Sequence, residues 1–531
     1  MLSRPPGAGN LTQTIPMATP TKTEQVDVLI VGSGPVGAAY ARVIADQQPE
    51  ASILMIDLGP KLTARAGQHI KNIADAPLRI AAQVMSQGPD QFEYRMATMP
   101  ERVAAARNGE MSFELLARPG THLLTTEKEA IRQSDMPAAA FASNVGGAGA
   151  HWTCACPRPG NTERINFIPD DEYEYAFAKA EELLCVTQDA FADTFESQAI
   201  LKVLGETFNY ELRRPVQKMP LACKIGEDGQ RYWVGSDIIL GDLAEPDYQG
   251  NFELRAGTIC RQLLTDGSRV TGAIIEHLLT GIQTEIQAKV VVVCADALRT
   301  PQLLWASEIR PRALGHYLNE HPLVLCFVQL DEQLLDPAVA KNDIMDPTVG
   351  VFWVPFDEPG HPFHAQVMHV DVSPVQIETA DKTKHVVGLG WGCPKELRFE
   401  DCIEFSATET DHLGMPRMNL IHKFTERDLA NIEGAKREQA KAAAAFGKQV
   451  SAGEQTLVPA GTSLHFQGTI RMGETNDGTS VCDSYSNVWG YENLFVGGNG
   501  VIPTAATCNP TLTSVAMAVR SAGRVIEKLQ A

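Results

Sequence analysis

The stretch Val26-Asp-Val-Leu-Ile-Val-Gly-Ser-Gly-Pro-Val-Gly37 decides the fold of this chain. Its first half is rich in apolar, β-branched residues, which is typical of a buried parallel strand. Gly32, Gly34 and Gly37 fit the pattern G-x-G-x-x-G. In this pattern the first glycine permits a tight turn, the second lets the backbone approach a pyrophosphate, and the third permits close packing of helix on strand. The stretch predicts a dinucleotide-binding turn, the alternative being a glycine turn with a purely structural role.

The residues that follow complete the beginning of a βαβ unit. Residues 38–46 favour a helix, whose N-terminus adds partial positive charge for a phosphate. Residues 52–56 form a second apolar run that ends at Asp57, 20 residues after Gly37. This spacing is typical of an acidic residue that contacts a ribose hydroxyl. The carboxylate speaks against a 2′-phosphate, because the two negative charges would repel each other, but the motif alone does not separate FAD from NAD.

The rest of the chain returns to this unit and adds a second one. Strand-like segments fill residues 251–293, and the last of them leads through a turn at Cys294 into a helix. Strand-like segments and loops alternate over residues 320–460, and residues 428–446 are rich in Ala, Lys and Glu, as in a helix. We predict an α/β fold with two domains and a disordered lead. The expected boundaries are residues 1–24 for the lead, 25–160 with 250–320 and 460–531 for a discontinuous nucleotide-binding domain, and 161–249 with 321–459 for a β-sheet-rich substrate domain.

Composition limits the classes of function. The chain has 531 residues, 44% of them hydrophobic and 21% charged, as in an ordinary soluble globular protein. Its net charge of -20 argues against nucleic acids and anionic membranes as partners. The 11 cysteines lack metal-ligand spacing and indicate reduced, mostly buried thiols. No apolar run is long enough for a membrane span, and the first residues lack a secretory signal, so we expect a cytoplasmic protein.

Two further motifs carry candidate chemistry. The glycine-rich segment Val145-Gly-Gly-Ala-Gly-Ala-His-Trp-Thr153 would let the backbone lie close to a flat ring. Near the C-terminus, His465 and Asn509 flank a strand-like run, the glycine pair Gly497-Gly498 and a turn. A neutral imidazole can take a hydroxyl proton, and a carboxamide can hydrogen-bond the same oxygen. By themselves these residues could equally be a core histidine and a turn former before a proline.

Several strings of residues together resemble the glucose-methanol-choline (GMC) oxidoreductase family, and within it the pyranose oxidases and their bacterial glycoside-oxidising relatives. These strings cover nearly the whole chain between residues 26 and 525. The strings are Val28–Gly37, Gly146–Cys154 (which contains His-Trp-Thr-Cys), Leu464–Gly473, and Asn493-Leu-Phe through Asn509-Pro-Thr-Leu512.

The resemblance implies FAD as the cofactor and the pair His465 and Asn509 as the catalytic residues. His465 would be the base that deprotonates a sugar hydroxyl, and Asn509 would orient that hydroxyl. Electrons would pass through the flavin to oxygen, giving hydrogen peroxide, or to a quinone. The implied substrate is a pyranose or pyranosyl glycoside oxidised at carbon 2 or carbon 3.

The resemblance also assigns residues around the flavin. In fungal pyranose oxidases the histidine that matches His151 carries the flavin covalently. Here Ala150 precedes it where those enzymes have threonine, so covalent attachment stays open. The remaining assignments are Thr153 beside the reactive edge of the flavin, Gly498 and Thr511 as further cofactor contacts, His364 and Gln366 as sugar contacts, and residues 371–376 as a gating loop.

Alternative interpretations remain. The histidines at 361, 364 and 369 could be ordinary loop residues, and a metal site lacks acidic partners at matching spacing. The same fold could host an alcohol dehydrogenase or a lyase acting on a non-sugar alcohol, or a flavin-binding module without catalysis. An NAD-linked dehydrogenase would differ by the absence of a yellow cofactor.

Overall fold

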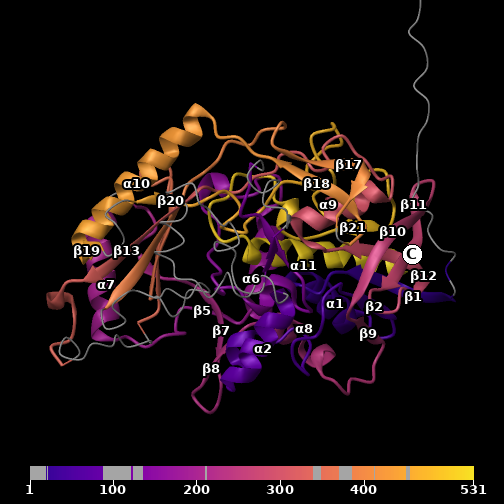
Figure 1. The fold of residues 1–531 in the computed structure, drawn as a ribbon, viewed down its shortest axis with the longest axis horizontal. Coiled ribbons are helices and arrows are strands. Elements are labelled where there is room, and N and C mark those ends of the chain that lie inside the picture. Colours follow the sequence, from indigo (N-terminus) through magenta and orange to yellow (C-terminus); the bar gives the residue numbers. More distant parts are fainter. Residues whose placement is uncertain are drawn as a thin grey trace, which may run out of the picture.

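The first predicted strand lies inside a seven-stranded sheet in the computed structural model (Figure 1). The structure describes residue 20 and residues 22–87, 121–123, 135–209, 212–338, 349–369, 385–411, 413–449 and 455–530. The strands of this first sheet are β1 (Lys22–Val31), β2 (Ile53–Ile56), β9 (Phe252–Arg255), β10 (Thr258–Asp266), β11 (Arg269–His277), β12 (Gln283–Val293) and β21 (Leu494–Val496). Their order is β10-β11-β12-β1-β2-β9, and β21 pairs with the C-terminal end of β12.

The pairing within the first sheet follows the βαβ prediction. Strands β12, β1, β2 and β9 run parallel, as does β21 beside β12, whereas β10 and β11 form an antiparallel extension. Helix α1 (Pro35–Gln47) follows β1 and packs against α11 (Thr511–Gln530), which in turn packs against α6 (Asp170–Leu183). The two ends of the chain therefore build one domain.

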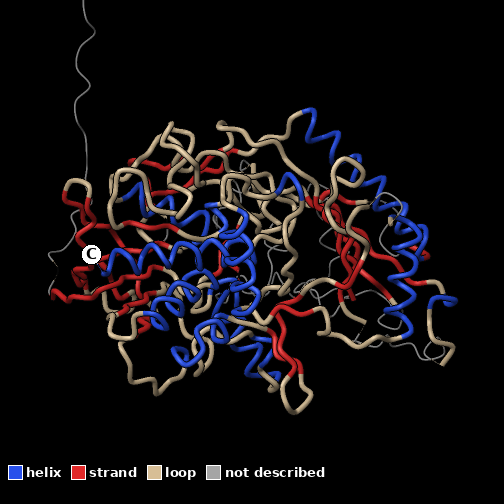
Figure 2. Tube along the Cα trace, turned by 180° about the vertical axis from the view of Figure 1, so that it is seen from behind, coloured by secondary structure: helices blue, strands red, loops and turns tan. Residues whose placement is uncertain are grey.

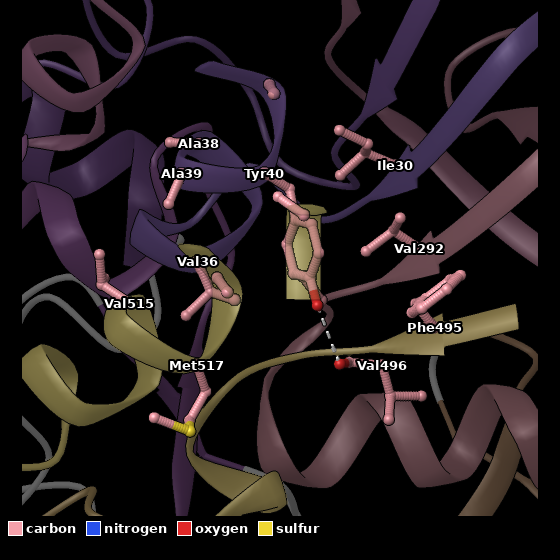
Figure 3. Close-up of a cluster of buried hydrophobic side chains, with 14 of the residues drawn as sticks. Ile30, Val36, Ala38, Ala39, Tyr40, Val292, Phe495, Val496, Val515 and Met517 are labelled. Atoms are coloured by element: carbon pink, nitrogen blue, oxygen red, sulfur yellow. Dashed lines mark hydrogen bonds between the residues drawn. The ribbon is translucent and has the colours of Figure 1, made fainter. Parts of the chain in front are cut away.

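A shared core explains why segments so far apart in sequence stay together. Figure 3 shows Tyr40 of α1 among side chains from β1, β12, β21 and α11, and the hydroxyl of Tyr40 donates a hydrogen bond to the carbonyl of Val496 over 3.4 Å. Tyr40 and Phe495 are completely buried. Burial of a large apolar side chain contributes about 1.5–3 kcal/mol each. This cluster holds the C-terminal segment, which carries Asn509, against the nucleotide-binding turn.

A second sheet lies at the other side of the molecule, at the left of Figure 1. Its order is β19-β13-β16-β15-β14-β6, with β20 added beside β13, and every pair is antiparallel. The strands are β6 (Gln217–Lys218), β13 (Leu323–Leu330), β14 (Val351–Val354), β15 (His364–His369), β16 (Val386–Gly392), β19 (Gly447–Gln449) and β20 (Thr456–Leu457).

Helix α10 (Glu426–Phe446) covers this sheet together with α7 (Phe195–Phe208), as Figure 2 shows from behind. Thr425 and Asp428 form a reciprocal capping box that starts α10. Buried side chains recur at three- and four-residue spacing along α10, including Ile432, Ala435, Ala442 and Phe446. This stripe packs onto β13 and β16. The second core is thus largely separate from the first.

The remaining elements lie outside the two seven-stranded sheets. They are α2 (Ala76–Gln87), α8 (Ser236–Leu240), α9 (Asp296–Ala306), the pair β3 (Thr121–Leu123) and β4 (Ala140–Ala142), the group β5 (Val186–Thr187), β7 (Leu221–Ile225) and β8 (Arg231–Trp233), the pair β17 (Cys402–Thr410) and β18 (Pro416–Ile421), and short 3-10 turns η1 (Ile70–Asn72), η3 (Gly147–Ala150), η4 (Asn161–Glu163), η5 (Gly241–Ala244), η6 (Glu332–Leu334) and η8 (Asn499–Val501). Helices α6 and α8 contribute to the core of the first sheet, although the sequence assigned residues 161–249 to the substrate domain.

The predicted boundary of the N-terminal lead is wrong by three residues. Residues 22–24, expected to belong to a disordered lead, begin β1 because their backbones pair with residues 284–286 of β12. The expected gating loop, residues 371–376, lies outside the described residues, as does most of the lead. All eleven cysteines are unpaired, and ten are buried. Within the described part of the chain, no helix combines the length and the apolar character needed to cross a bilayer.

Candidate functional site

The three glycines of the G-x-G-x-x-G pattern lie in the surroundings that the pattern predicts for each of them. Gly32 has φ +103, and a Cβ there would lie 2.3 Å from the carbonyl oxygen of Cys294. A Cβ on Gly37 would lie 2.0 Å from the carbonyl oxygen of Gly32. A Cβ on Gly34 would meet no atom within 4 Å, because Gly34 faces open space in front of α1. Two glycines therefore allow close packing, and the third leaves room for a ligand.

That open space belongs to a large cavity of about 1450 Å³, part of which opens to solvent. Five of the predicted cofactor residues line this cavity: Gly32, Gly34, Asp57, Gly498 and Thr511. The N-termini of α1 and α11 both meet at it, through Gly34 and Thr511. Helix N-termini attract anionic groups, so the cavity suits a ligand that carries phosphates.

Asp57 lines the cavity, and three hydrogen bonds hold its carboxylate in place. One oxygen accepts hydrogen bonds from the Ser33 backbone N–H over 3.1 Å and from the Ser33 hydroxyl over 2.6 Å. The other accepts from the backbone N–H of Gly59 over 2.8 Å. Burial raises the pKa of Asp57 from its ordinary value. Because a carboxylate offers about four lone-pair sites, Asp57 can still accept a ribose hydroxyl.

His151 and Thr153 lie beside this cavity without lining it, although Trp152 between them does. The His151 ring is buried, and its Nε2 lies 2.8 Å from Oδ1 of Asn144. Thr153 is half-buried. Asn144 also donates to the carbonyls of Val145 and Gly147. The ring of His151 is thus tied to the glycine-rich loop.

Asn509 lies next to both predicted sugar contacts. Its Oδ1 is 3.0 Å from Nε2 of His364 and 2.5 Å from Nε2 of Gln366. His364 and Gln366 alternate along β15, so their side chains share one face of the second sheet. The structure therefore places these two residues against the Asn509 carboxamide, which the sequence did not anticipate.

The Trp353 indole fixes the protonation of His364. Its N–H, which can only donate, points to Nδ1 of His364 over 3.0 Å. Nδ1 of His364 must therefore accept, and the proton of the neutral ring is on Nε2, where it is donated to Asn509. Burial is the main cause that lowers the pKa of His364 to about 3, and the nearby His321 adds to it. With its oxygen occupied, Asn509 keeps its NH₂ group for another partner.

The neutral state of His364 predicts an acid-sensitive stability. An unfolded histidine binds a proton below about pH 6.5, whereas the buried ring resists protonation down to about pH 3. As the pH is lowered from about 6.5 towards 3, the unfolded chain binds a proton that the folded protein does not bind. Relative to a His364→Gln variant, the wild-type free energy of unfolding should therefore decrease by about 1.4 kcal/mol for each unit by which the pH is lowered. Thermal unfolding of both proteins from pH 8 to pH 4 measures this. The difference should be constant above pH 7, and a constant difference throughout would contradict a neutral, buried ring.

His465 contacts a second histidine, His321, and the neighbouring Ser463. Its Nδ1 lies 3.1 Å from Nε2 of His321, and its backbone N–H donates to the Ser463 hydroxyl over 3.1 Å. The rings of His465 and His321 meet nearly edge to face, with centroids 4.8 Å apart. His321 also contributes to the lowered pKa of His364. It therefore lies near both His465 and the histidine that contacts Asn509.

The loop that carries Asn509 is anchored by a buried carboxylate. Oε1 of Glu163 accepts hydrogen bonds from the backbone and hydroxyl of Thr507 and from the backbone of Cys508, over 2.6–3.1 Å. Oε2 of Glu163 accepts from the backbone of Gly160 over 2.9 Å. These contacts hold the residues directly before Asn509.

Sequence reasoning missed His321, Trp353, Asn144 and Glu163. None belongs to a recognisable motif, and each reaches the site only through tertiary contacts. The one weak signal is His321 itself, which stands between an acidic residue and a proline directly before a predicted strand. Among the described residues, no group of three or more His, Cys, Asp and Glu side chains is arranged to hold a metal ion.

Comparison with known proteins shows which family the chain resembles over most of its length. Two family models, both described as GMC oxidoreductase, match residues 160–323 and 403–518. The chain is 42% identical to a C-glycoside 3-oxidase from Microbacterium trichothecenolyticum, over 97% of this chain and 99% of that protein. It is 30% identical to a pyranose 2-oxidase from Tricholoma matsutake, over 95% of this chain and 94% of that protein.

A solved structure supports the same fold. A pyridoxine 4-oxidase from Mesorbium loti superposes with a TM-score of 0.59 and 16% sequence identity, covering 94% of this chain and 98% of that chain. At this identity the likeness concerns the fold alone. The arrangement of a parallel nucleotide-binding sheet beside an antiparallel sheet is therefore found in another oxidase.

Proposed function

Because the chain belongs to the GMC oxidoreductase family, we propose that it is an FAD-dependent oxidase that converts carbon 3 of a pyranosyl glycoside to a ketone. The observation that carries the proposal is the 42% identity to C-glycoside 3-oxidases from two organisms over nearly the full chain. Pyranose 2-oxidases are similar at 25–30% identity, which makes carbon 2 of a free pyranose the second candidate.

The large cavity fits the FAD that this function needs. Gly34 leaves room for a pyrophosphate at the N-terminus of α1, and Asp57 is available to a ribose hydroxyl. Thr511 and Gly498 line the same cavity from the C-terminal segment. We propose that the cofactor is held without a covalent bond to His151, because Nε2 of that buried ring already contacts Asn144. When bound, FAD supplies the two-electron acceptor for the carbon–hydrogen bond and passes the electrons to oxygen.

His465 and Asn509 divide the work on the substrate hydroxyl. His465 takes the hydroxyl proton on Nε2, because its Nδ1 is engaged with His321. Asn509 donates from its NH₂ group to the same oxygen, because His364 and Gln366 occupy its carbonyl oxygen. A prepositioned donor stabilises the negative charge that develops on the oxygen without reorganising during the reaction.

The function is tested with the purified protein and a C-glucoside. Under anaerobic conditions the C-glucoside should bleach the yellow flavin, and in air it should yield hydrogen peroxide and a ketone that NMR places at carbon 3. The 3-deoxy analogue should leave the flavin oxidised, whereas the 2-deoxy analogue should bleach it. Acid precipitation should leave the flavin in the supernatant.

Other outcomes would redirect the proposal. A ketone at carbon 2 of glucose would favour the pyranose 2-oxidase reaction. A flavin that no sugar or glycoside bleaches would reject sugar oxidation and favour another alcohol or a lyase.

A further inference from the structure

A small polar cavity adjoins the contact between His465 and His321. Four polar side chains line it: Glu320, His321, His422 and Ser463. It offers about 10 Å³ to the centre of a water molecule. This volume is close to the smallest that holds one water, which needs two to four polar partners. Its walls include none of the residues that line the large cofactor cavity.

Two connections join this cavity to His465. The first is the 3.1 Å contact between Nδ1 of His465 and Nε2 of His321. The second runs through Ser463, whose hydroxyl accepts from the His465 backbone N–H and donates to Glu320. Glu320 also accepts from the backbone N–H of Gly461 and is 3% exposed. The loop before His465 is thereby fastened to Glu320.

His422 lines the cavity with a ring whose nitrogens lack hydrogen bonds to the described residues. The ring is 5% exposed, and neither of its nitrogens has a hydrogen-bond partner among the described residues. Burial, together with the Lys395 cation, lowers the pKa of His422 to about 3, so the ring is neutral and offers one donor and one acceptor. Leaving such groups buried without a partner is unfavourable, because they lose the hydrogen bonds that water gives them in the unfolded chain. A water in the cavity would satisfy one of them.

We propose that this cavity holds a water that links His321 with Glu320 and His422, and that His321 carries away the proton that His465 takes from the substrate. The inference rests on the proposed function, since it needs His465 as the base. In this scheme His321 touches the base and not the substrate, so it acts as a positioning and relay residue.

In the proposed relay, four proton transfers connect the substrate hydroxyl with the carboxylate of Glu320. The hydroxyl proton moves to Nε2 of His465, and the proton on Nδ1 of His465 moves to Nε2 of His321. The proton on Nδ1 of His321 moves to the water, and a proton of the water moves to the carboxylate of Glu320. Both imidazoles end neutral as their other tautomers, Glu320 becomes a neutral carboxylic acid, and no other bond changes.

Glu320 is suited to receive and release a proton. Burial raises the pKa of Glu320 to about 7, against the lowering effect of its hydrogen bonds to residues 461–464. In the part of the chain that the structure describes, further titratable or charged groups near the relay include His364, His422 and the ion pair of Lys395 and Asp401.

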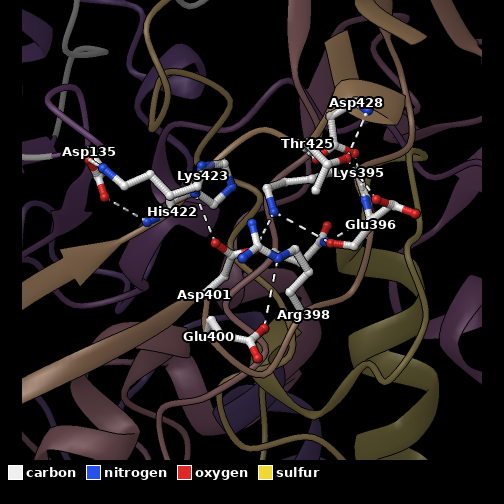
Figure 4. A network of polar contacts seen from close by, with 11 residues as sticks. Asp135, Lys395, Glu396, Arg398, Glu400, Asp401, His422, Lys423, Thr425 and Asp428 are labelled. Carbon is white, nitrogen blue, oxygen red and sulfur yellow. Dashed lines mark hydrogen bonds and ion pairs between the residues drawn. The ribbon is translucent and has the colours of Figure 1, made fainter. Parts of the chain in front are cut away.

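Beyond His422 a polar network leads to the surface. Figure 4 shows the buried ion pair of Lys395 and Asp401 beside His422, followed by Lys423 and Asp135. Asp401 accepts from the backbone N–H of Lys423, and Asp135 accepts from the backbone N–H of His422. Lys423 is 63% exposed. These contacts fix the backbone of His422 and join it to the exposed Lys423.

The first test is a crystal structure of the FAD-loaded protein at a resolution that shows ordered waters. One water should lie within hydrogen-bond distance of at least two of Glu320, His321, His422 and Ser463. A cavity without water density would overturn the proposal. This test does not depend on the substrate, so it stands even if sugars prove not to be oxidised.

The second test measures flavin reduction in rapid anaerobic mixing, with whichever alcohol bleaches the wild-type flavin. A His321→Ala variant should reduce its flavin about 10²-fold more slowly, at the low end for a positioned proton-transfer group, with an unchanged substrate dissociation constant. Added imidazole should restore part of the rate, which a merely structural role would not allow. The matched control is His316→Gln, since His316 contacts the Phe399 carbonyl and stacks on its ring, away from this cavity.

The outcomes separate clearly. A wild-type rate in His321→Ala, or a slow rate that imidazole leaves unchanged, would overturn the relay. If His321→Ala fails to hold FAD, His422→Phe replaces it, because that change removes both ring nitrogens from the cavity wall. His422→Phe should also slow reduction, and a wild-type rate would overturn the relay. Absence of bleaching in the wild type itself would instead reject the proposed function.

Discussion

Replacing His465 by alanine should slow reduction of the flavin by glycoside about 10²- to 10⁴-fold, the range for loss of a positioned general base. The variant should still fold and bind FAD, because the His465 side chain does not line the large cavity. Its backbone N–H can still donate to Ser463. The effect should therefore fall on the chemical step.

Anaerobic rapid mixing over a range of glycoside concentrations separates the rate of reduction from substrate binding. The visible spectrum of the variant checks that FAD is bound. Asn509→Ala is the companion variant, and the double variant should lose less than the product of the single effects, because both residues act on one oxygen. A reduction rate within tenfold of the wild type would remove His465 from the role of base.

Exchanging single glycines for alanine should separate packing from cofactor binding in the fingerprint. Gly37→Ala should prevent formation of a stable, yellow protein, because its Cβ would lie 2.0 Å from the Gly32 carbonyl oxygen, inside the contact between β1 and α1. Overpacking of this kind costs about 1–3 kcal/mol or more. Gly34→Ala should fold normally, because Gly34 has φ -62 and its Cβ would meet no protein atom. It should bind FAD much more weakly, since the methyl group would enter the space proposed for the pyrophosphate.

Thermal unfolding of the apoproteins and titration with FAD measure the two effects independently. Gly523→Ala is the matched control, because Gly523 lies within α11 and its Cβ would also meet open space. Alanine favours a helix over glycine by about 1 kcal/mol, so this variant should be as stable as the wild type or more so. Wild-type FAD affinity in Gly34→Ala would show that the cofactor does not pass this turn.

Local pattern predicted much of the fold. Helix α10 begins two residues before the predicted residues 428–446 and ends with them, and strands β13 to β16 lie within the predicted strand-rich residues 320–460. These elements were readable because strand and helix periodicities, glycine turns and capping residues act over a few positions. Gly34 and Asp57 of the predicted nucleotide-binding turn line one cavity together with Gly498 and Thr511, which the resemblance assigned to the cofactor.

Long-range partners could not be read in this way. His364 and Gln366 were recognised as candidates, but their contact with Asn509 depends on how β15 of the second sheet meets the loop before α11. The tautomer of His364 depends on Trp353, which lies on a neighbouring strand and carries no motif. His364 and Asn509 are 145 positions apart in the chain, and the contact between Trp353 and His364 depends on the pairing of β14 with β15.

The sequence by itself determined the α/β fold class, the strand–turn–helix beginning of the first domain and the family, because each depends on residue types at short, regular spacing. Only the tertiary structure decided which groups surround His465 and Asn509. The burial that makes His364 and His422 neutral, and the placement of Glu320 and His321 around one small cavity, arise from packing of separate elements. Desolvation and hydrogen-bond partners set the protonation of these groups, and neither is encoded in a local stretch of residues.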